Sequence, residues 1–285
     1  MVIEREVFER VIGFINLDGN IKAAILNGSR ANPNASRDFM QDYDIALYVA
    51  DLAEAQKYKK DRSWISFFGN LIILQQNNFE DNSFIFLLQY SNSLRLDLSF
   101  HDVESLKKNI KDDSLSIVLY DKYGLTDEIA EPNESTYYVQ KPTEQKWDET
   151  LNELWWLQVY IAKELWRDEI PLAKELYDVW LINCLRDLVS WHIAVEKNWT
   201  INVGHGGKWF KRLLPQEIYE EYNYFYSSAD INEQWQKLLN IGGFIRKIAQ
   251  PLSVKLRYKY PDTYDSNVSS YIRRIRKLKP DAATL

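Results

Sequence analysis

The chain has 285 residues, 46% of them hydrophobic, which is enough for one large domain or two ordinary ones with buried cores. Its formal net charge of −6 argues against a general nucleic-acid binder, because such proteins contact phosphates mainly through cationic side chains. The single cysteine, Cys184, cannot form an internal disulfide or a zinc site. The charged stretch 1–10 and the lack of a long apolar run lead us to expect a cytoplasmic protein with no membrane partner.

The first half of the chain predicts one helix followed by several strands. Residues 4–16 place apolar side chains three and four positions apart, which is the spacing of an amphipathic helix. Short apolar or alternating runs follow, separated by turn-forming residues, and each predicts a β-strand: 21–26, 44–49, 84–90 and 94–100. Residues 91–93, between the last two strands, predict a hairpin turn.

Two aspartates, Asp42 and Asp44, stand at the head of one of these strands with a single residue between them. Because side chains alternate faces along a strand, both carboxylates point the same way and can share one hard cation. Ligation by oxygen atoms alone suits Mg²⁺. Upstream, a predicted strand ends in Gly28, where the backbone can approach a phosphate, and Ser29, whose hydroxyl can donate to it. Together these features predict a site for a nucleoside triphosphate and its metal.

The strand 94–100 alternates between apolar and polar side chains. Its leucines and its phenylalanine share one face, and Asp97 lies on the other face with Arg95 and Ser99. The alternation therefore projects a third carboxylate from the polar face of a strand.

A polar segment, residues 126–146, contains two prolines, and we place a domain boundary within it, between residues 135 and 136. Beyond it the hydrophobic period is helical, and the expected helical stretches are 149–166, 168–198, 208–226 and 232–250, with Asp168 as an N-cap, Pro171 in the next turn, and breaks at Pro215 and at Gly242 and Gly243. We therefore expect an α+β fold, in which residues 1–135 form a mixed sheet with flanking helices and residues 136–285 form an all-helical domain.

The glycine-serine pair, the aspartate pair and the third carboxylate form an ordered set that resembles the nucleotidyltransferase superfamily that includes DNA polymerase beta. The strings NGSRAN, QDYDIALYV, LRLDLSF and WHIAVEKNW, followed by GHGGKWFKRLL, are similar to the aminoglycoside 6-adenylyltransferases, and the similarity runs through both halves of the chain. It implies a catalytic sheet domain and a helical domain that completes the acceptor and nucleotide cleft. The implied activity is transfer of AMP from ATP to a hydroxyl of an aminoglycoside, namely the 6-position of streptomycin, which confers antibiotic resistance.

The resemblance and the chemistry of nucleotidyl transfer imply a role for each residue of the sheet domain's motifs. The reaction needs an in-line attack on the α-phosphate, where negative charge builds up, and Mg²⁺ supplies the counter-charge. Asp42 and Asp44 would hold the metal. Gly28, Ser29 and Arg30 would hold the β and γ phosphates.

Four further residues are candidates for the site. Asp97 either completes the metal shell or takes the acceptor proton, and the resemblance favours the second role. Lys208 and Lys211 follow a glycine loop and open a predicted helix, where they form either a solvated basic turn or a contact with the triphosphate. Glu153 is the first candidate for binding a cationic acceptor, ahead of the other acidic residues of the helical half, Glu164, Asp168, Glu169 and Asp187.

Other functions stay open at this point. The acceptor could be a lincosamide or another small hydroxyl compound, although a lincosamide would need a more apolar pocket. The chain could also be a non-catalytic nucleotidyltransferase-like partner in a toxin–antitoxin pair, but such a protein has no need for three carboxylates. A polymerase would need a basic face, which this composition does not supply. The expected partners are ATP and a cationic aminoglycoside, without nucleic acid, and the expected state is a monomer or a weak homodimer.

Overall fold

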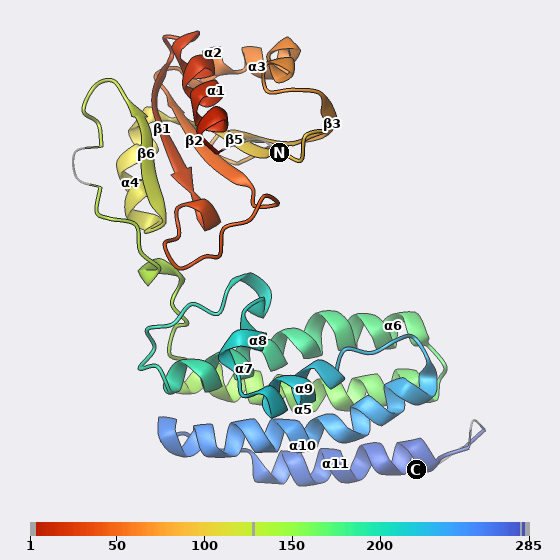
Figure 1. The fold of residues 1–285 in the computed structure, drawn as a ribbon. Coiled ribbons are helices and arrows are strands. Elements are labelled where there is room, and N and C mark those ends of the chain that lie inside the picture. Colours follow the sequence, from red (N-terminus) through yellow and green to blue (C-terminus); the bar gives the residue numbers. More distant parts are fainter. Residues whose placement is uncertain (1–3, 127–128, 280, 283–285) are drawn as a thin grey trace. The chain divides into compact units, whose positions relative to one another are not determined.

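The computed structural model describes residues 4–126, 129–279 and 281–282 (Figure 1). The first three residues of the charged N-terminal stretch, and Asp127 and Glu128 in the polar segment, lie outside the described residues. The chain divides into two compact units, unit 1 (Met1–Thr136) and unit 2 (Tyr137–Leu285), each with its own apolar core. The boundary expected from the sequence lies between residues 135 and 136. The predicted α+β class, with a mixed sheet before a helical region, is confirmed.

Unit 1 is built on a six-stranded mixed sheet with the strand order β3-β4-β5-β2-β1-β6. The strands are β1 (Ile21–Asn27), β2 (Tyr43–Val49), β3 (Leu71–Asn78), β4 (Phe84–Tyr90), β5 (Arg95–Asp102) and β6 (Ser116–Asp121). β2 and β5 are parallel, and each other neighbouring pair is antiparallel. The parallel pair brings the starts of β2 and β5, which carry the aspartates, side by side in the middle of the sheet.

Helices cover the two faces of this sheet unequally. α1 (Glu4–Asn16) packs on one face of the sheet (Figure 1). Its buried residues, Val7, Val11, Phe14 and Ile15, belong to the apolar core on that face. The short helices α2 (Leu52–Ala55) and α3 (Lys57–Lys60) follow β2, and Tyr58 of α3 joins the same core. α4 (Leu106–Asp112) packs on the other face, against apolar residues of β1 and β2. The face of α4 is the one from which the polar side chains of β5 project.

Unit 2 consists of helices. They are α5 (Glu144–Trp166), α6 (Ile170–Glu175), α7 (Ile182–Val195), α8 (Phe210–Leu213), α9 (Gln216–Tyr224), α10 (Ile231–Leu256) and α11 (Asp262–Lys277). A π-helical turn, Leu176–Leu181, joins α6 to α7 without a break. Thr143 caps α5 and Asp230 caps α10, since each side chain accepts a hydrogen bond from a backbone N–H of the first turn. Within the described ranges, no helix is both long and apolar enough to cross a membrane.

Two predictions for the helical half are wrong. The sequence predicts a break at Gly242 and Gly243, but α10 runs through both residues. A Cβ on Gly242 would lie 3.2 Å from the ring of Trp155, so this glycine allows α10 to pack closely on α5. Asp168 is not an N-cap, because its backbone is left-handed with a φ of 62°, and Glu169 takes the capping position of α6.

The sequence analysis also misses the two edge strands, β3 and β6. β3 ends in four amide side chains and is exposed along most of its length, so no apolar alternation marks it. β6 is only partly buried beyond its first residue. An edge strand has a single neighbour, and its sequence is correspondingly less constrained by burial.

Candidate functional site

The site is organised by the register of three neighbouring strands. β1 and β2 pair Asn27 with Asp44, and β2 and β5 pair Asp44 with Asp97. The three side chains therefore form a row across the sheet, on the face that carries α4. They line a cavity of about 250 Å³. This row brings the carboxylate of Asp44 next to that of Asp97. Alternation along each strand predicts the face of each residue, and the pairing of β2 with β5 makes them neighbours.

Gly28 follows β1 directly and packs against Asp44. Its φ is 70°, in the left-handed region that favours glycine. A Cβ at this position would overlap Oδ2 of Asp44 and would lie 3.1 Å from its Cγ, so only glycine leaves room for this carboxylate. The two sequence motifs, one with the glycine and one with the aspartate pair, are therefore in direct contact.

The carboxyl group of Asp44 is partly removed from water and has other carboxylates around it. The pKa of its carboxyl is raised from 3.8 to about 6, first by burial and then by the charges of Asp97 and Asp42, while Arg95 opposes the shift. Asp97 is only 8% exposed. Asp42 lies closer to the surface, with 36% of its side chain exposed. Such a group of carboxylates favours the binding of a cation.

Arg95 reaches two of these carboxylates from β5. Its Nε donates to Oδ1 of Asp97 at 3.2 Å, and its Nη2 donates to Oδ2 at 3.1 Å. Its Nε also lies 3.4 Å from Oδ2 of Asp42. Alternation along β5 predicts Arg95 on the face of Asp97, and its position two residues before that aspartate is the pattern that indicates their contact.

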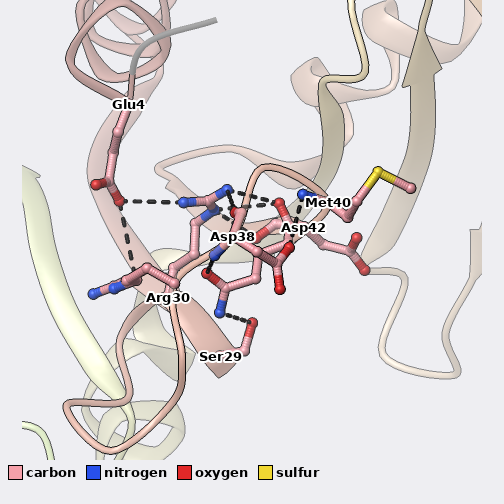
Figure 2. A network of polar contacts seen from close by, with 8 residues as sticks. Glu4, Ser29, Arg30, Asp38, Met40 and Asp42 are labelled. Carbon is pink, nitrogen blue, oxygen red and sulfur yellow. Dashed lines mark hydrogen bonds and ion pairs between the residues drawn. The ribbon is translucent and has the colours of Figure 1, made fainter. Parts of the chain in front are cut away.

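Arg30 fixes the loop that leads from β1 to β2 (Figure 2). It is 5% exposed, and its guanidinium donates to the backbone carbonyls of Asp38, Gln41 and Asp42, the shortest contact being 2.9 Å. Its Nη1 lies 3.4 Å from Oε1 of Glu4. The sequence leads us to expect Arg30 at the phosphates, whereas in the structure its guanidinium is bonded to the loop that ends at Asp42.

The neighbours of Gly28 tie the site to adjoining elements. The hydroxyl of Ser29 accepts a hydrogen bond from the side-chain amide of Gln41 at 3.3 Å. The side chain of Asn27, which the sequence analysis does not single out, donates to Oγ of Ser116 at 2.8 Å and to Oδ2 of Asp113 at 3.2 Å. A second cavity of about 600 Å³, along α4 and β6, shares Asp113 and Ser116 with the carboxylate cavity. The two cavities of unit 1 therefore lie next to each other at Asp113 and Ser116.

Lys208 and Lys211 belong to unit 2, where both line a hollow of about 330 Å³ together with Gly206 and Tyr226. Lys208 precedes α8, and Lys211 lies within it. The sequence leaves a solvated basic turn and a contact with the triphosphate open for these lysines, and α8 has only four residues, so it is too short for a strong helix dipole.

Glu153 lies on α5, and its carboxylate and that of Asp187 on α7 both act on Cys184. The pKa of the Cys184 thiol is raised to about 11, first by burial and then by the charges of Glu153 and Asp187, while Lys146 opposes the shift. Glu164, by contrast, is buried and paired with Arg167 at 3.0 Å. Among the acidic candidates of the helical half, Glu153 and Asp187 are thus the two whose charges raise the pKa of this thiol.

The carboxylates of unit 1 fit a cation that takes further ligands from a phosphate. Among the side chains that the structure describes, no three from His, Cys, Asp and Glu are grouped so that they could hold a metal ion by themselves. Mg²⁺ is commonly held by one or two carboxylates together with substrate phosphates and water. Asp42 and Asp44 offer such a pair, beside a glycine whose backbone a phosphate can approach.

The chain matches the family described as streptomycin adenylyltransferase over residues 1–275. It is 31% identical over 281 residues to the aminoglycoside 6-adenylyltransferase of Bacillus subtilis (strain 168), a match that covers 95% of this chain and 97% of that protein. The protein of the same name from Campylobacter jejuni is 28% identical over 281 residues, with 96% of each chain covered. A crystal structure of an aminoglycoside 6-adenyltransferase from Bacillus subtilis aligns with a TM-score of 0.49 and 26% identity, covering 98% of this chain and 100% of that one.

Asp44→Asn should stabilise unit 1 at neutral pH. Because the pKa of Asp44 is raised, the folded protein keeps a proton between about pH 4 and pH 6 that the unfolded chain has lost, so stability falls as pH rises through this window. At about pH 7.5 we expect the variant to be more stable than the wild type by about 1–3 kcal/mol, and we expect the difference to vanish near pH 4.

Urea unfolding between about pH 4 and pH 8 measures this difference, with hydrogen exchange of peptides from β2 and β5 reporting on unit 1. Asp112→Asn, at the exposed end of α4, is the matched control. An Asp44→Asn protein that is no more stable than the wild type at neutral pH would contradict the account of Asp44.

Proposed function

The chain belongs to the streptomycin adenylyltransferase family, and we propose that it transfers AMP from ATP to a hydroxyl of streptomycin, at the 6-position. The family resemblance inferred from the sequence is confirmed. The observation that carries the proposal is the row of Asn27, Asp44 and Asp97 across three strands, with Gly28 packed on Asp44. In this arrangement a backbone that phosphates can approach lies next to a group of carboxylates that can hold a metal, and nucleotidyl transfer requires both.

The residues of unit 1 suit the steps of the reaction. The acceptor hydroxyl attacks the α-phosphorus of ATP in line with the bond that breaks, and pyrophosphate leaves. We assign Asp42 and Asp44 to hold Mg²⁺, and Gly28 and Ser29 to the triphosphate. When bound, Mg²⁺ neutralises the charge that develops on the α-phosphate and on the leaving pyrophosphate. The raised pKa of Asp44 supports this assignment, because a desolvated carboxylate beside other carboxylates gains most from a cation.

For Asp97 we propose the role of general base. Each of its oxygens accepts one hydrogen bond from Arg95 and keeps a further lone pair that can receive the acceptor proton. The fork of Arg95 also fixes the orientation of the carboxylate, which a base needs in order to meet the attacking hydroxyl.

We assign the acceptor contacts to unit 2. The charges of Glu153 on α5 and Asp187 on α7 both act on Cys184, and carboxylates pair in a bidentate manner with guanidinium groups such as those of streptomycin. Lys208 and Lys211, which share one hollow, are the candidates for a further contact with the triphosphate. The use of ATP also fits the cytoplasmic location expected from the sequence.

A screen of acceptors with ATP and Mg²⁺, read by pyrophosphate release, tests the proposal. Streptomycin should be the best acceptor by kcat/KM, and spectinomycin and lincomycin should be poor, because neither carries guanidinium groups to pair with the carboxylates.

Asp42→Asn and Asp44→Asn should abolish pyrophosphate release in protein that is still folded, whereas Asp112→Asn, on the exposed end of α4, should keep wild-type turnover. Lincomycin as the best acceptor would move the assignment to the lincosamides, and a folded wild type without activity on any acceptor would refute it.

The two roles of Asp97 predict different kinetics for Asp97→Asn. As a general base, its loss should lower kcat by roughly 10²–10⁴-fold, leave the affinity for ATP and Mg²⁺ nearly unchanged, and remove the acidic limb of the pH–rate profile. Calorimetric titration of nucleotide and metal, together with the pH–rate profile, measures these quantities. If the variant binds Mg²⁺ much more weakly and recovers its rate at high Mg²⁺, Asp97 is a metal ligand instead.

A further inference from the structure

Arg95 places a positive charge where two carboxylates of the site converge. Its contacts with them are unequal, because two hydrogen bonds of 3.1 and 3.2 Å reach Asp97 while one ion pair of 3.4 Å reaches Asp42. The side chain of Asp97 is 10% exposed, whereas those of Arg95 and Asp42 are 43% and 36% exposed. The contact with Asp42 is therefore both the longer and the more accessible of the two.

We propose that Arg95 is the counter-ion of the carboxylate site in the nucleotide-free protein, and that Mg²⁺ arriving with ATP displaces it from Asp42 while it keeps its hold on Asp97. The inference rests on the proposed function, since it concerns the metal site of that reaction. In this role Arg95 positions Asp97 and also sets the metal affinity of the site.

The competition follows from charge and distance. A guanidinium and a divalent cation cannot both occupy the accessible side of the Asp42 carboxylate without strong repulsion. Free Mg²⁺ must therefore displace Arg95 with the carboxylates as its only protein ligands, whereas Mg²⁺ bound to ATP brings phosphate oxygens as well. Arg95 thus reserves the site for the metal–nucleotide complex.

The shape of the side chain explains why the counter-ion stays on Asp97. A planar guanidinium holds both oxygens of a carboxylate, which a lysine ammonium cannot do in the same geometry. The other arginine beside this site, Arg30, is buried and bound to loop carbonyls and Glu4, so it is not placed to exchange with a cation. The shift of Arg95 from two carboxylates to one is the conformational change that we expect on loading.

Metal binding to the nucleotide-free full-length protein tests this, with Mn²⁺ as the probe and electron paramagnetic resonance of free Mn²⁺ as the readout. Arg95→Gln should bind Mn²⁺ roughly 5- to 30-fold more tightly than the wild type, because a charge that competes for Asp42 is gone. Arg95→Lys, which keeps the charge but loses the fork, should lie between the two. Arg5→Gln removes an exposed arginine that pairs with Glu9 at 2.7 Å, and it should leave Mn²⁺ affinity unchanged.

A second titration uses Mn²⁺ with a non-hydrolysable ATP analogue. The affinity for the metal–nucleotide complex should also rise in Arg95→Gln, because that complex too has to displace Arg95 from Asp42 in the wild type. A folded Arg95→Gln whose Mn²⁺ affinity equals or falls below that of the wild type would overturn the inference, as would Mn²⁺ binding that is undetectable in both. Should Arg95→Gln not fold, Arg95→Met, which keeps an extended side chain without the charge, takes its place with the same expected result.

These readouts separate the inference from the proposed function, because they need neither acceptor nor turnover. The expected order of Mn²⁺ affinities in a protein that modifies no aminoglycoside would refute the proposed function and leave the role of Arg95 standing. Activity on streptomycin, with no change of Mn²⁺ affinity in Arg95→Gln, would support the proposed function and refute the role of Arg95.

Discussion

The position of the half-buried Asp44 between Asn27 and Asp97 is the constraint on which the site depends. The register of β1, β2 and β5 sets it, and a slip by one residue would turn Asp44 into the apolar core beneath the sheet. The core under α1 therefore holds the carboxylate on the opposite face, although burial and like charges raise its pKa to about 6. A charged carboxylate in these surroundings costs free energy, and a bound cation would lower that cost.

Arg30 and Arg95 both contact the segments that carry these carboxylates, but they do so in different ways. Arg30 is buried and donates to the carbonyls of the loop that ends at Asp42, so it fixes the backbone of the site. Arg95 is partly exposed and contacts side-chain carboxylates, so it can change partners while the backbone stays in place. A rigid row of side chains and one adjustable counter-ion together suit a site that must accept a metal–nucleotide complex and release it again.

The sequence is informative where local rules act and less so where contacts between distant segments decide. Alternation along β5 and the spacing in α1 predict the faces of Asp97 and of Val7 because each depends on neighbours along one element. By contrast, the contact of Gly28 with Asp44 depends on the pairing of β1 with β2, and the contact of Arg95 with Asp42 depends on the pairing of β2 with β5, and no residue pattern states either pairing. Gly242 shows the same limit, since a glycine that reads as a helix breaker is in fact the place where α10 meets Trp155.

The most direct test of the account is the kcat of adenylyl transfer by Gly28→Ala, beside Gly19→Ala as a control at a glycine of unit 1 with open space around its α-carbon. The added methyl group would displace the Asp44 carboxylate, and a misplaced catalytic group can lower the rate by about 10²-fold. The account predicts a loss of at least about this size in Gly28→Ala, with the fold intact and Gly19→Ala close to wild type. A Gly28→Ala enzyme with near-wild-type kcat would contradict the claim that the glycine and the aspartate form one site.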